Sequence, residues 1–204
     1  MLCLHSGDNP IAQSQIQPHL DLEADLAWEE TQIERHEYLA GEVFVMSSGT
    51  DAHYAILGNF FAGLKASLSG TPCRPFVSGM KVHIETADAV LYPDVFVTCG
   101  ARDKTSEAAL AKAHPTLIAE VLSDSTAAYD RGRKFELYQQ IAELQEYLII
   151  EQDRSHADLF RKNDEGLWVL HPIPPGGTIN LQSLKLSLPL AELYVDVELK
   201  ASAS

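Results

Sequence analysis

The spacing of apolar residues changes along the chain, and each change predicts a different kind of element. Between residues 51 and 69 the apolar residues recur every three or four positions, which predicts a helix with one buried stripe. They are Leu57, Phe60, Phe61, Leu64 and Leu68. The hydroxyl of Thr50 is placed to cap the first turn of this helix. Charged and apolar residues mixed over 26–39 predict a shorter helix that ends near Gly41.

Runs of β-branched and alternating apolar residues predict strands. The expected strands cover residues 42–46, 76–84, 90–98, 117–122, 146–151, 157–161 and 167–171. The run at 117–122, LIAEVL, is nearly all apolar, which is typical of a central strand covered on both faces. Residues 127–144 are expected to be helical, and the Pro-Gly segment 172–177 is expected to be a loop.

The order of these elements predicts the fold class. Helix, strands, helix and strands in one chain of 204 residues indicate a single α/β domain, with a central mixed β-sheet flanked by helices. The polar residues 1–24, which include two prolines, are expected to form a flexible N-terminal extension. The folded domain is therefore predicted to cover residues 25–198.

Composition narrows the classes of function. Fifteen lysines and arginines against 29 acidic residues give a formal charge of −14, which disfavours tight sequence-independent binding to nucleic acid or to anionic membranes. No apolar run approaches the roughly 18 residues that span a bilayer. The three cysteines Cys3, Cys73 and Cys99 form no CxxC pair, so a reducing cytoplasm is the expected location and Cys99 is expected to be a small core residue.

Charged residues stand at three places where the pattern calls for apolar ones. Asp94 interrupts one apolar strand, and Glu120 lies in the middle of LIAEVL. Lys134 follows Asp130 by four residues and precedes Tyr138 by four, so helical geometry points all three toward the sheet. Two carboxylates on neighbouring strands and a nearby ammonium are therefore expected to converge.

This combination indicates metal-assisted chemistry. A buried, ionised and unpaired carboxylate costs several kcal/mol, so Glu120 must be neutralised by a proton, a cation or a metal. The oxygens of Asp94 and Glu120 are the hard ligands that suit Mg²⁺ or Mn²⁺. Such an ion lowers the pKa of a bound water, while Lys134 neutralises charge on a phosphoryl oxygen. The predicted reaction is hydrolysis of a phosphodiester.

The arrangement of Pro93-Asp94 and then Glu120-Val121-Leu122 resembles the PD-(D/E)xK motif of restriction-endonuclease-like nucleases. More closely, the chain resembles the Uma-type family, a domain of unknown function classed with those nucleases. The matching stretches are HEYLAGEVFVMSSGTDAHYAIL, YPDVFVTC, PTLIAEVLSDST and YDRGRKFELYQQIAELQEYLII, which cover most of residues 33–155.

The resemblance implies a restriction-endonuclease-like core and a metal-dependent DNA endonuclease. Asp94 and Glu120 would be the metal ligands, with the backbone carbonyl of Val121 as a third. The lysine of the motif should stand two residues after the glutamate, where this chain has Leu122, and Lys134 on the following helix takes its place. By analogy with such nucleases, a homodimer is also expected.

Four more residues are candidates for accessory roles, namely Glu37, His53, Asp130 and Tyr138. Glu37 and His53 match positions of the family: Glu37, expected near the end of the first helix, could be a third acidic group, and His53 a base with a suitable intrinsic pKa. Arg131 and Arg133 beside Lys134 could contact flanking phosphates.

Simpler roles stay open for the same residues. Asp94 could be a turn residue, Glu120 could form a structural salt bridge with Lys134, and Lys134 could instead be a solvated helix lysine. Asp130 suits a helix N-terminus, and Tyr138 and His53 suit the core, while Glu37 could be solvated. The competing function is then a catalytically inactive nuclease-like scaffold that binds a protein or a nucleic acid. A glycosidase with two carboxylates ranks last, because few aromatic residues neighbour the pair.

Overall fold

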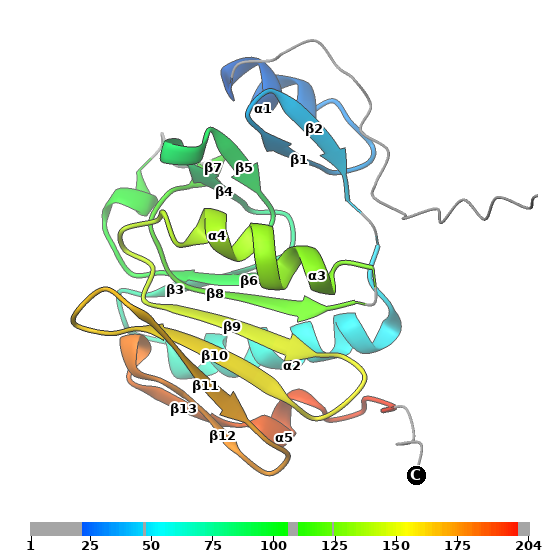
Figure 1. Ribbon diagram of the computed structural model, residues 1–204, viewed down its shortest axis with the longest axis vertical. Coiled ribbons are helices and arrows are strands. Elements are labelled where there is room, and N and C mark those ends of the chain that lie inside the picture. Colours follow the sequence, from blue (N-terminus) through cyan, green and yellow to red (C-terminus); the bar gives the residue numbers. More distant parts are fainter. Residues whose placement is uncertain (1–21, 47, 106–109, 124, 200–204) are drawn as a thin grey trace, which may run out of the picture.

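A six-stranded mixed sheet forms the centre of the molecule (Figure 1). The computed structural model describes residues 22–199 apart from 47, 106–109 and 124. In spatial order the strands are β11 (Trp168–Ile173), β10 (Ala157–Lys162), β9 (Glu146–Glu151), β8 (Pro115–Leu122), β6 (Val95–Thr98) and β3 (Arg74–Val77). Only β8 and β9 pair in parallel in this sheet, and its other neighbours are antiparallel. The predicted central strand at 117–122 is confirmed as β8, which has a neighbour on each side.

Two smaller sheets complete the fold. The second sheet has the order β2 (Glu42–Val45), β1 (His36–Leu39), β5 (Ala89–Leu91), β4 (Lys81–Ile84) and β7 (Ala111–Lys112). The third is a hairpin of β12 (Thr178–Leu181) and β13 (Leu186–Pro189), which the sequence pattern did not predict. This hairpin packs its apolar residues into the same core as the large sheet.

Helices cover both faces of the large sheet. The long helix α2 (Asp51–Ser67) lies behind the sheet in Figure 1, and the short helices α3 (Ala127–Tyr129) and α4 (Phe135–Tyr138) lie in front of it. A π-helical turn over Asp130–Lys134 joins α3 to α4. The remaining helices are α1 (Leu22–Glu29) and α5 (Leu190–Leu193), with 3₁₀ turns at Glu85–Ala87, Arg102–Lys104 and Gln182–Leu184.

The two faces of β8 belong to two separate cores. Leu117, Ala119 and Val121 pack with α2, whereas Ile118 and Leu122 pack with α4 and the second sheet. This alternation follows from the two-residue period of a strand. It places the side chain at position 120 on the face that α3 and α4 cover.

Helix α2 confirms the prediction for residues 51–69. Thr50 is its N-cap, and the Thr50 hydroxyl accepts a hydrogen bond of 3.2 Å from the backbone N–H of His53. The buried residues of the helix are His53, Ile56, Leu57, Phe60 and Leu64. The predicted stripe is therefore the face that packs on the sheet.

The prediction of one helix over 26–39 is wrong. Helix α1 ends at Glu29, and strand β1 begins at His36. The four residues of β1 are too few to show a period of two, and the tight turn at Ala40-Gly41, where φ is +49° and +91°, joins β1 to β2. The predicted extension at 1–24 lies almost entirely outside the described residues.

The predicted strands at 76–84 and 90–98 each divide into two strands of different sheets. The first is interrupted at Ser78-Gly79, where φ is positive at both residues, and the chain leaves β3 for β4. The second is interrupted at Pro93, which has no N–H to donate to a ladder. The helix predicted over 127–144 is also shorter than expected, because it ends at Tyr138.

Cys99, predicted to be a small core residue, packs partly buried against the core, but its pairing was not predicted. Cys73 and Cys99 form a disulfide. The antiparallel register of β3 and β6 pairs Arg74 with Thr98, so the next residues outward along both strands are the two cysteines. The spacing of cysteines in the sequence could not reveal this pair, because only the register brings the two side chains together.

Reduction of this disulfide should lower the melting temperature by several degrees. The bond closes a loop with a sequence separation of 26, for which the lost entropy of the unfolded chain is worth about 3 kcal/mol. Thermal unfolding with and without dithiothreitol measures the effect, and Cys73→Ser/Cys99→Ser should melt at one temperature under both conditions. Equal melting of oxidised and reduced wild type would contradict the expectation.

Candidate active site

The two predicted acids meet between β6 and β8. Asp94 immediately precedes β6, whose first residue Val95 pairs with Ala119, the neighbour of Glu120. The backbone N–H of Asp94 donates to Glu120 Oε2 at 3.0 Å, and the backbone N–H of Val121 donates to Asp94 Oδ2 at 2.8 Å. These reciprocal bonds fix both carboxylates against the neighbouring strand. The structure therefore brings Asp94, Glu120 and the main chain of Val121 together.

Lys134 reaches the same point from the π-helical turn. Its Nζ lies 3.1 Å from Glu120 Oε1, 3.1 Å from Glu37 Oε1 and 3.7 Å from Asp130 Oδ1. Only 5% of Lys134 and 2% of Glu120 are exposed, so the pair lies in the interior. The solvated position considered for this lysine is thereby excluded.

Asp130, Lys134 and Tyr138 point toward the sheet, as their helical spacing predicted. The hydroxyl of Tyr138 donates to Glu120 Oε1 at 3.0 Å, and Asp130 is buried beside Lys134. The π-helical turn that carries Asp130 and Lys134 was not predicted, because its sequence DRGRK has no distinguishing pattern. Such turns are rare and occur frequently at functional sites.

Glu37 reaches Lys134 from a strand and not from the predicted helix. It lies in β1, and its Oε1 also accepts a hydrogen bond from the backbone N–H of Tyr92 at 3.3 Å. It is buried, so the solvated alternative is wrong. The glycine at 41, which marks a turn between two short apolar segments, was the signal that could have placed Glu37 in a hairpin.

His53 contacts the second carboxylate oxygen of Asp94, which Val121 leaves free. Its Nε2 is 3.2 Å from Asp94 Oδ1, and its Nδ1 is buried with no hydrogen-bond partner among the described residues. Burial alone would lower the pKa of His53, but the hydrogen bond to Asp94 and the charge of that carboxylate offset it, so the pKa is raised. The imidazole therefore holds Asp94 in place.

The site carries more negative than positive charge. Desolvation raises the pKa of Glu120 well above its ordinary value, and the charges of Asp94 and Asp130 add to this against the opposing effect of Lys134. Burial works against the charge of Lys134, but Glu120 and Glu37 raise its pKa well above the ordinary value. Lys134 is thus charged, and its single charge faces several carboxylates.

This charge imbalance fits a divalent cation. Asp94 is the most open of the acids, with 21% of its side chain exposed, and Mg²⁺ is usually held by one or two carboxylates while it keeps several waters. Within the described part of the chain, no group of three or more His, Cys, Asp or Glu residues is placed to hold a metal ion. A cation at this site would therefore have fewer than three such protein ligands and would keep several waters.

Arg131 and Arg133 are held by protein carboxylates. Arg131 forms ion pairs of 2.8 Å with Asp158 and 2.5 Å with Glu151, and Arg133 lies 3.3 Å from Glu136. These pairs occupy the guanidinium groups that were expected to meet phosphates. The structure therefore gives this expectation no support.

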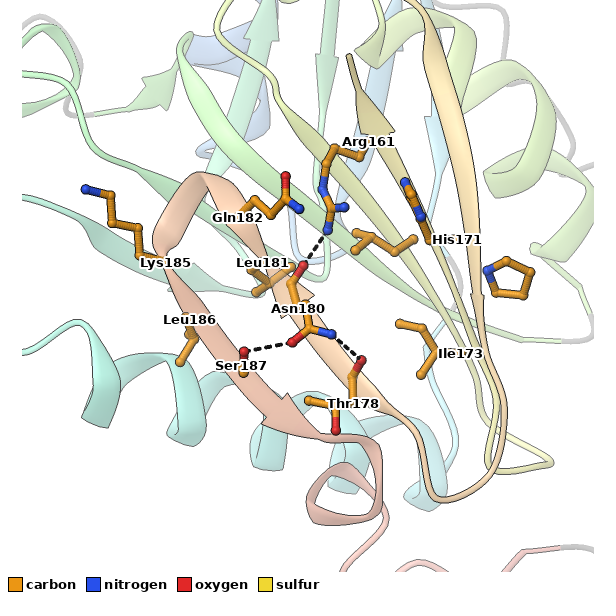
Figure 2. Close-up of a pocket in the computed structure, with 12 residues that line it drawn as sticks. Arg161, His171, Ile173, Thr178, Asn180, Leu181, Gln182, Lys185, Leu186 and Ser187 are labelled. Carbon is orange, nitrogen blue, oxygen red and sulfur yellow. Dashed lines mark hydrogen bonds between the residues drawn. The ribbon is translucent and has the colours of Figure 1, made fainter. Parts of the chain in front are cut away.

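A cavity of about 540 Å³ lies elsewhere, between strands β10 and β11 and the β12–β13 hairpin (Figure 2). Its polar lining includes Arg161, His171 and Asn180, and Arg161 donates to the backbone carbonyl of Asn180. None of the candidate residues lines it. The candidate site lies between β6 and β8 and is separate from this cavity.

The fold is that of a restriction-endonuclease-like protein. A crystal structure titled as "a putative nuclease belonging to DUF820", from Anabaena variabilis ATCC 29413, superposes with a TM-score of 0.72 at 16% identity, covering 88% of this chain and 99% of the other. This likeness confirms the predicted fold class.

The family model Uma2, described as "Putative restriction endonuclease", matches residues 22–191, and the chain belongs to this family. Two relatives come from Synechocystis sp. (strain ATCC 27184 / PCC 6803 / Kazusa). The uncharacterised protein slr1290 is 37% identical over 87% of this chain and 92% of its own length. The uncharacterised protein sll1609 is 32% identical over 70% of this chain and 80% of its own length. No helix among the described residues has the length and apolar content needed to cross a bilayer.

Lys134→Met should destabilise the protein far more than Glu120→Gln. Removal of the ammonium leaves three buried carboxylates uncompensated, which costs about 3–5 kcal/mol. Glu120→Gln leaves Glu37 and Asp130 for the lysine and loses mainly the bond from the Asp94 N–H, about 1–2 kcal/mol. Denaturant unfolding measures both, with the exposed Lys65→Met as control.

The loss of unfolding free energy caused by Glu120→Gln should become smaller as the pH rises. Because the folded pKa of Glu120 is raised above 4.5, its protonation stabilises the wild type at low pH, and this stability is lost as the pH rises through the folded value. Unfolding at pH 5 and pH 8 tests the sign. A penalty that grows toward pH 8, or equal losses for Lys134→Met and Lys65→Met, would show that the buried pair is described wrongly.

Proposed function

We propose that the protein is a metal-dependent endonuclease that hydrolyses phosphodiester bonds in DNA. The observation that carries the proposal is the convergence of Asp94, Glu120 and Lys134 from three separate elements within hydrogen-bond distance. Membership of a family described as "Putative restriction endonuclease" supports the reaction class. The relocated lysine needs only to place its ammonium near the phosphate, and its position in the chain is immaterial.

The oxygens of Asp94 and Glu120, with the backbone carbonyl of Val121, would hold Mg²⁺ or Mn²⁺. When bound, such an ion acidifies a water and stabilises negative charge on a phosphoryl oxygen. The protein residues keep the carboxylates in position: the Val121 N–H and His53 orient Asp94, and the Asp94 N–H orients Glu120.

Lys134 would supply the fixed positive charge of the reaction. Glu37 and Asp130 hold its ammonium beside Glu120, and the hydroxyl of Tyr138 completes the hydrogen bonds of that carboxylate. A charge held in this way needs little reorganisation when negative charge develops on the phosphate, which is the main source of electrostatic catalysis. Asp130, Glu37, His53 and Tyr138 are accordingly positioning residues in this proposal. A homodimer would present one such site to each DNA strand.

A second candidate function is an inactive nuclease-like scaffold that binds a protein or a nucleic acid. It is favoured by the complete pairing of Glu120 inside the protein, with Lys134 and Tyr138 on Oε1 and the Asp94 N–H on Oε2. In this alternative the charged residues form a structural ion pair and need no metal. The two functions differ in what divalent ions do.

Nicking of supercoiled plasmid DNA tests the proposed reaction. With Mn²⁺ or Mg²⁺ the wild type should produce open circles, and Asp94→Asn, Glu120→Gln and Lys134→Ala should each reduce the rate by about 10²-fold or more. Lys65→Gln, a charge loss at an exposed position near the far end of α2, should cleave at the wild-type rate. Equal nicking by all five proteins would identify a contaminant and remove the endonuclease proposal.

Thermal unfolding with added Mn²⁺ separates the two functions. An ion that binds only the folded protein at 100 times its dissociation constant stabilises it by about 2.7 kcal/mol, so the melting temperature should rise by about 5–10 °C. Asp94→Asn should remove most of this shift, whereas Lys65→Gln should keep it. No shift in the wild type at millimolar Mn²⁺ would favour the scaffold.

A further inference from the structure

Arg35 stands at the entrance of strand β1, two residues before Glu37. Residues two apart on an extended chain point to the same side, so Arg35 leaves the backbone on the side that carries Glu37 toward Lys134. The backbone carbonyl of Arg35 already accepts a hydrogen bond of 2.9 Å from the N–H of Met46, which extends the β1–β2 pairing to this position. Unlike Glu37, Arg35 is exposed.

The Arg35 guanidinium lies against two neighbours, Tyr92 and Gly79. Its Cζ lies 5.8 Å from the centre of the Tyr92 ring, which is within cation–π distance. A Cβ atom built at Gly79 would lie 2.7 Å from Arg35 Nη2, so no larger residue fits at position 79 without moving the arginine. Gly79 also has φ of +98°, a backbone conformation that side chains disfavour. The absence of a side chain at position 79 therefore leaves room for the guanidinium beside the loop between β3 and β4.

Both neighbours are connected to Asp94, one along the chain and one through a hydrogen bond. Tyr92 precedes Asp94 by two residues, and the N–H of Ser78, next to Gly79, donates to the backbone carbonyl of Asp94 at 3.0 Å. Tyr92 in addition donates its N–H to Glu37. The Arg35 guanidinium is thus tied to the candidate site through two independent routes.

Arg35 has charge available for a ligand. Within the described ranges of the chain, no carboxylate lies within ion-pair distance of its guanidinium, whereas Arg131 and Arg133 are paired and Lys134 is buried. The acids near the same tyrosine are already bound. Glu29 accepts hydrogen bonds from His36 and from the hydroxyl of Tyr92, and Glu30 pairs with Lys81 at 2.8 Å.

We infer that Arg35 binds a backbone phosphate of the DNA substrate next to the scissile bond, an inference that rests on the proposed endonuclease function. The planar guanidinium suits a phosphate because it donates two parallel hydrogen bonds. In a chain of net charge −14, a cation beside the site with no carboxylate partner among the described residues draws the phosphate backbone to the carboxylates that would otherwise repel it. Arg35 acts on substrate position, and Lys134 acts at the reacting group.

The test compares Arg35→Gln with Lys65→Gln, which removes the same charge from an exposed position elsewhere. Binding of a fluorescein-labelled 20-base-pair duplex is measured by anisotropy over a range of salt concentrations in the Glu120→Gln background. Arg35→Gln should weaken binding about tenfold and reduce the slope of log affinity against log salt by about 1. In active protein it should raise KM more than it lowers kcat. Lys65→Gln should leave the affinity, the salt dependence, KM and kcat unchanged.

One further variant and one further measurement separate a phosphate contact from a structural role. Arg35→Lys, which keeps the positive charge, should restore part of the affinity, and Arg35→Gln should unfold at the wild-type melting temperature. If Arg35→Gln and Lys65→Gln bind DNA equally while the wild type cleaves, this inference is overturned and the endonuclease stands. If the wild type neither binds nor cleaves DNA, both fail.

Discussion

The buried ammonium of Lys134 is the interaction on which the rest of the structure depends. Glu120 belongs to the large sheet and Glu37 to the second sheet, and Lys134 contacts both at 3.1 Å from the short helical segment between them. Without this positive charge, the two sheets would bring carboxylates together with nothing to neutralise them. The packing of the large sheet against the second sheet and the charge balance of the site therefore depend on the same ion pairs.

Such an arrangement is a poor choice for stability alone. The desolvation of a buried ion pair commonly equals or exceeds its electrostatic gain, and apolar residues of similar volume often stabilise a core more. The surroundings of Glu120 are otherwise apolar, since Ile118 and Leu122 on the same face of β8 pack into the hydrophobic core. A buried, net negative group of side chains in this position is consistent with selection for a chemical role, because stability does not account for it.

The fold class and the residues of the candidate site could be predicted from the sequence more fully than the bounds of the elements around them. Asp94 and Glu120 could be found because each charge interrupts an apolar strand, and Lys134 because the spacing from Asp130 to Tyr138 follows a helical face. Glu37 was recognised as a candidate but assigned to a helix, since the four residues of β1 are too short for their periodicity to show. The pairing of Cys73 with Cys99 and the hairpin β12–β13 depend on long-range register, which no local pattern records.

The breaks in the predicted strands explain why the site lies where it does. At Ser78-Gly79 and again at Pro93 the chain crosses between the second sheet and the large one, and the Ser78 N–H bonds to the carbonyl of Asp94 across these two crossings. A continuous strand would have kept Asp94 within a ladder, with its backbone N–H committed to a neighbouring carbonyl. Because the strand is interrupted there, that N–H is available for Glu120. The backbone irregularities that made the strand predictions wrong thus also leave free the backbone N–H group that positions the carboxylate.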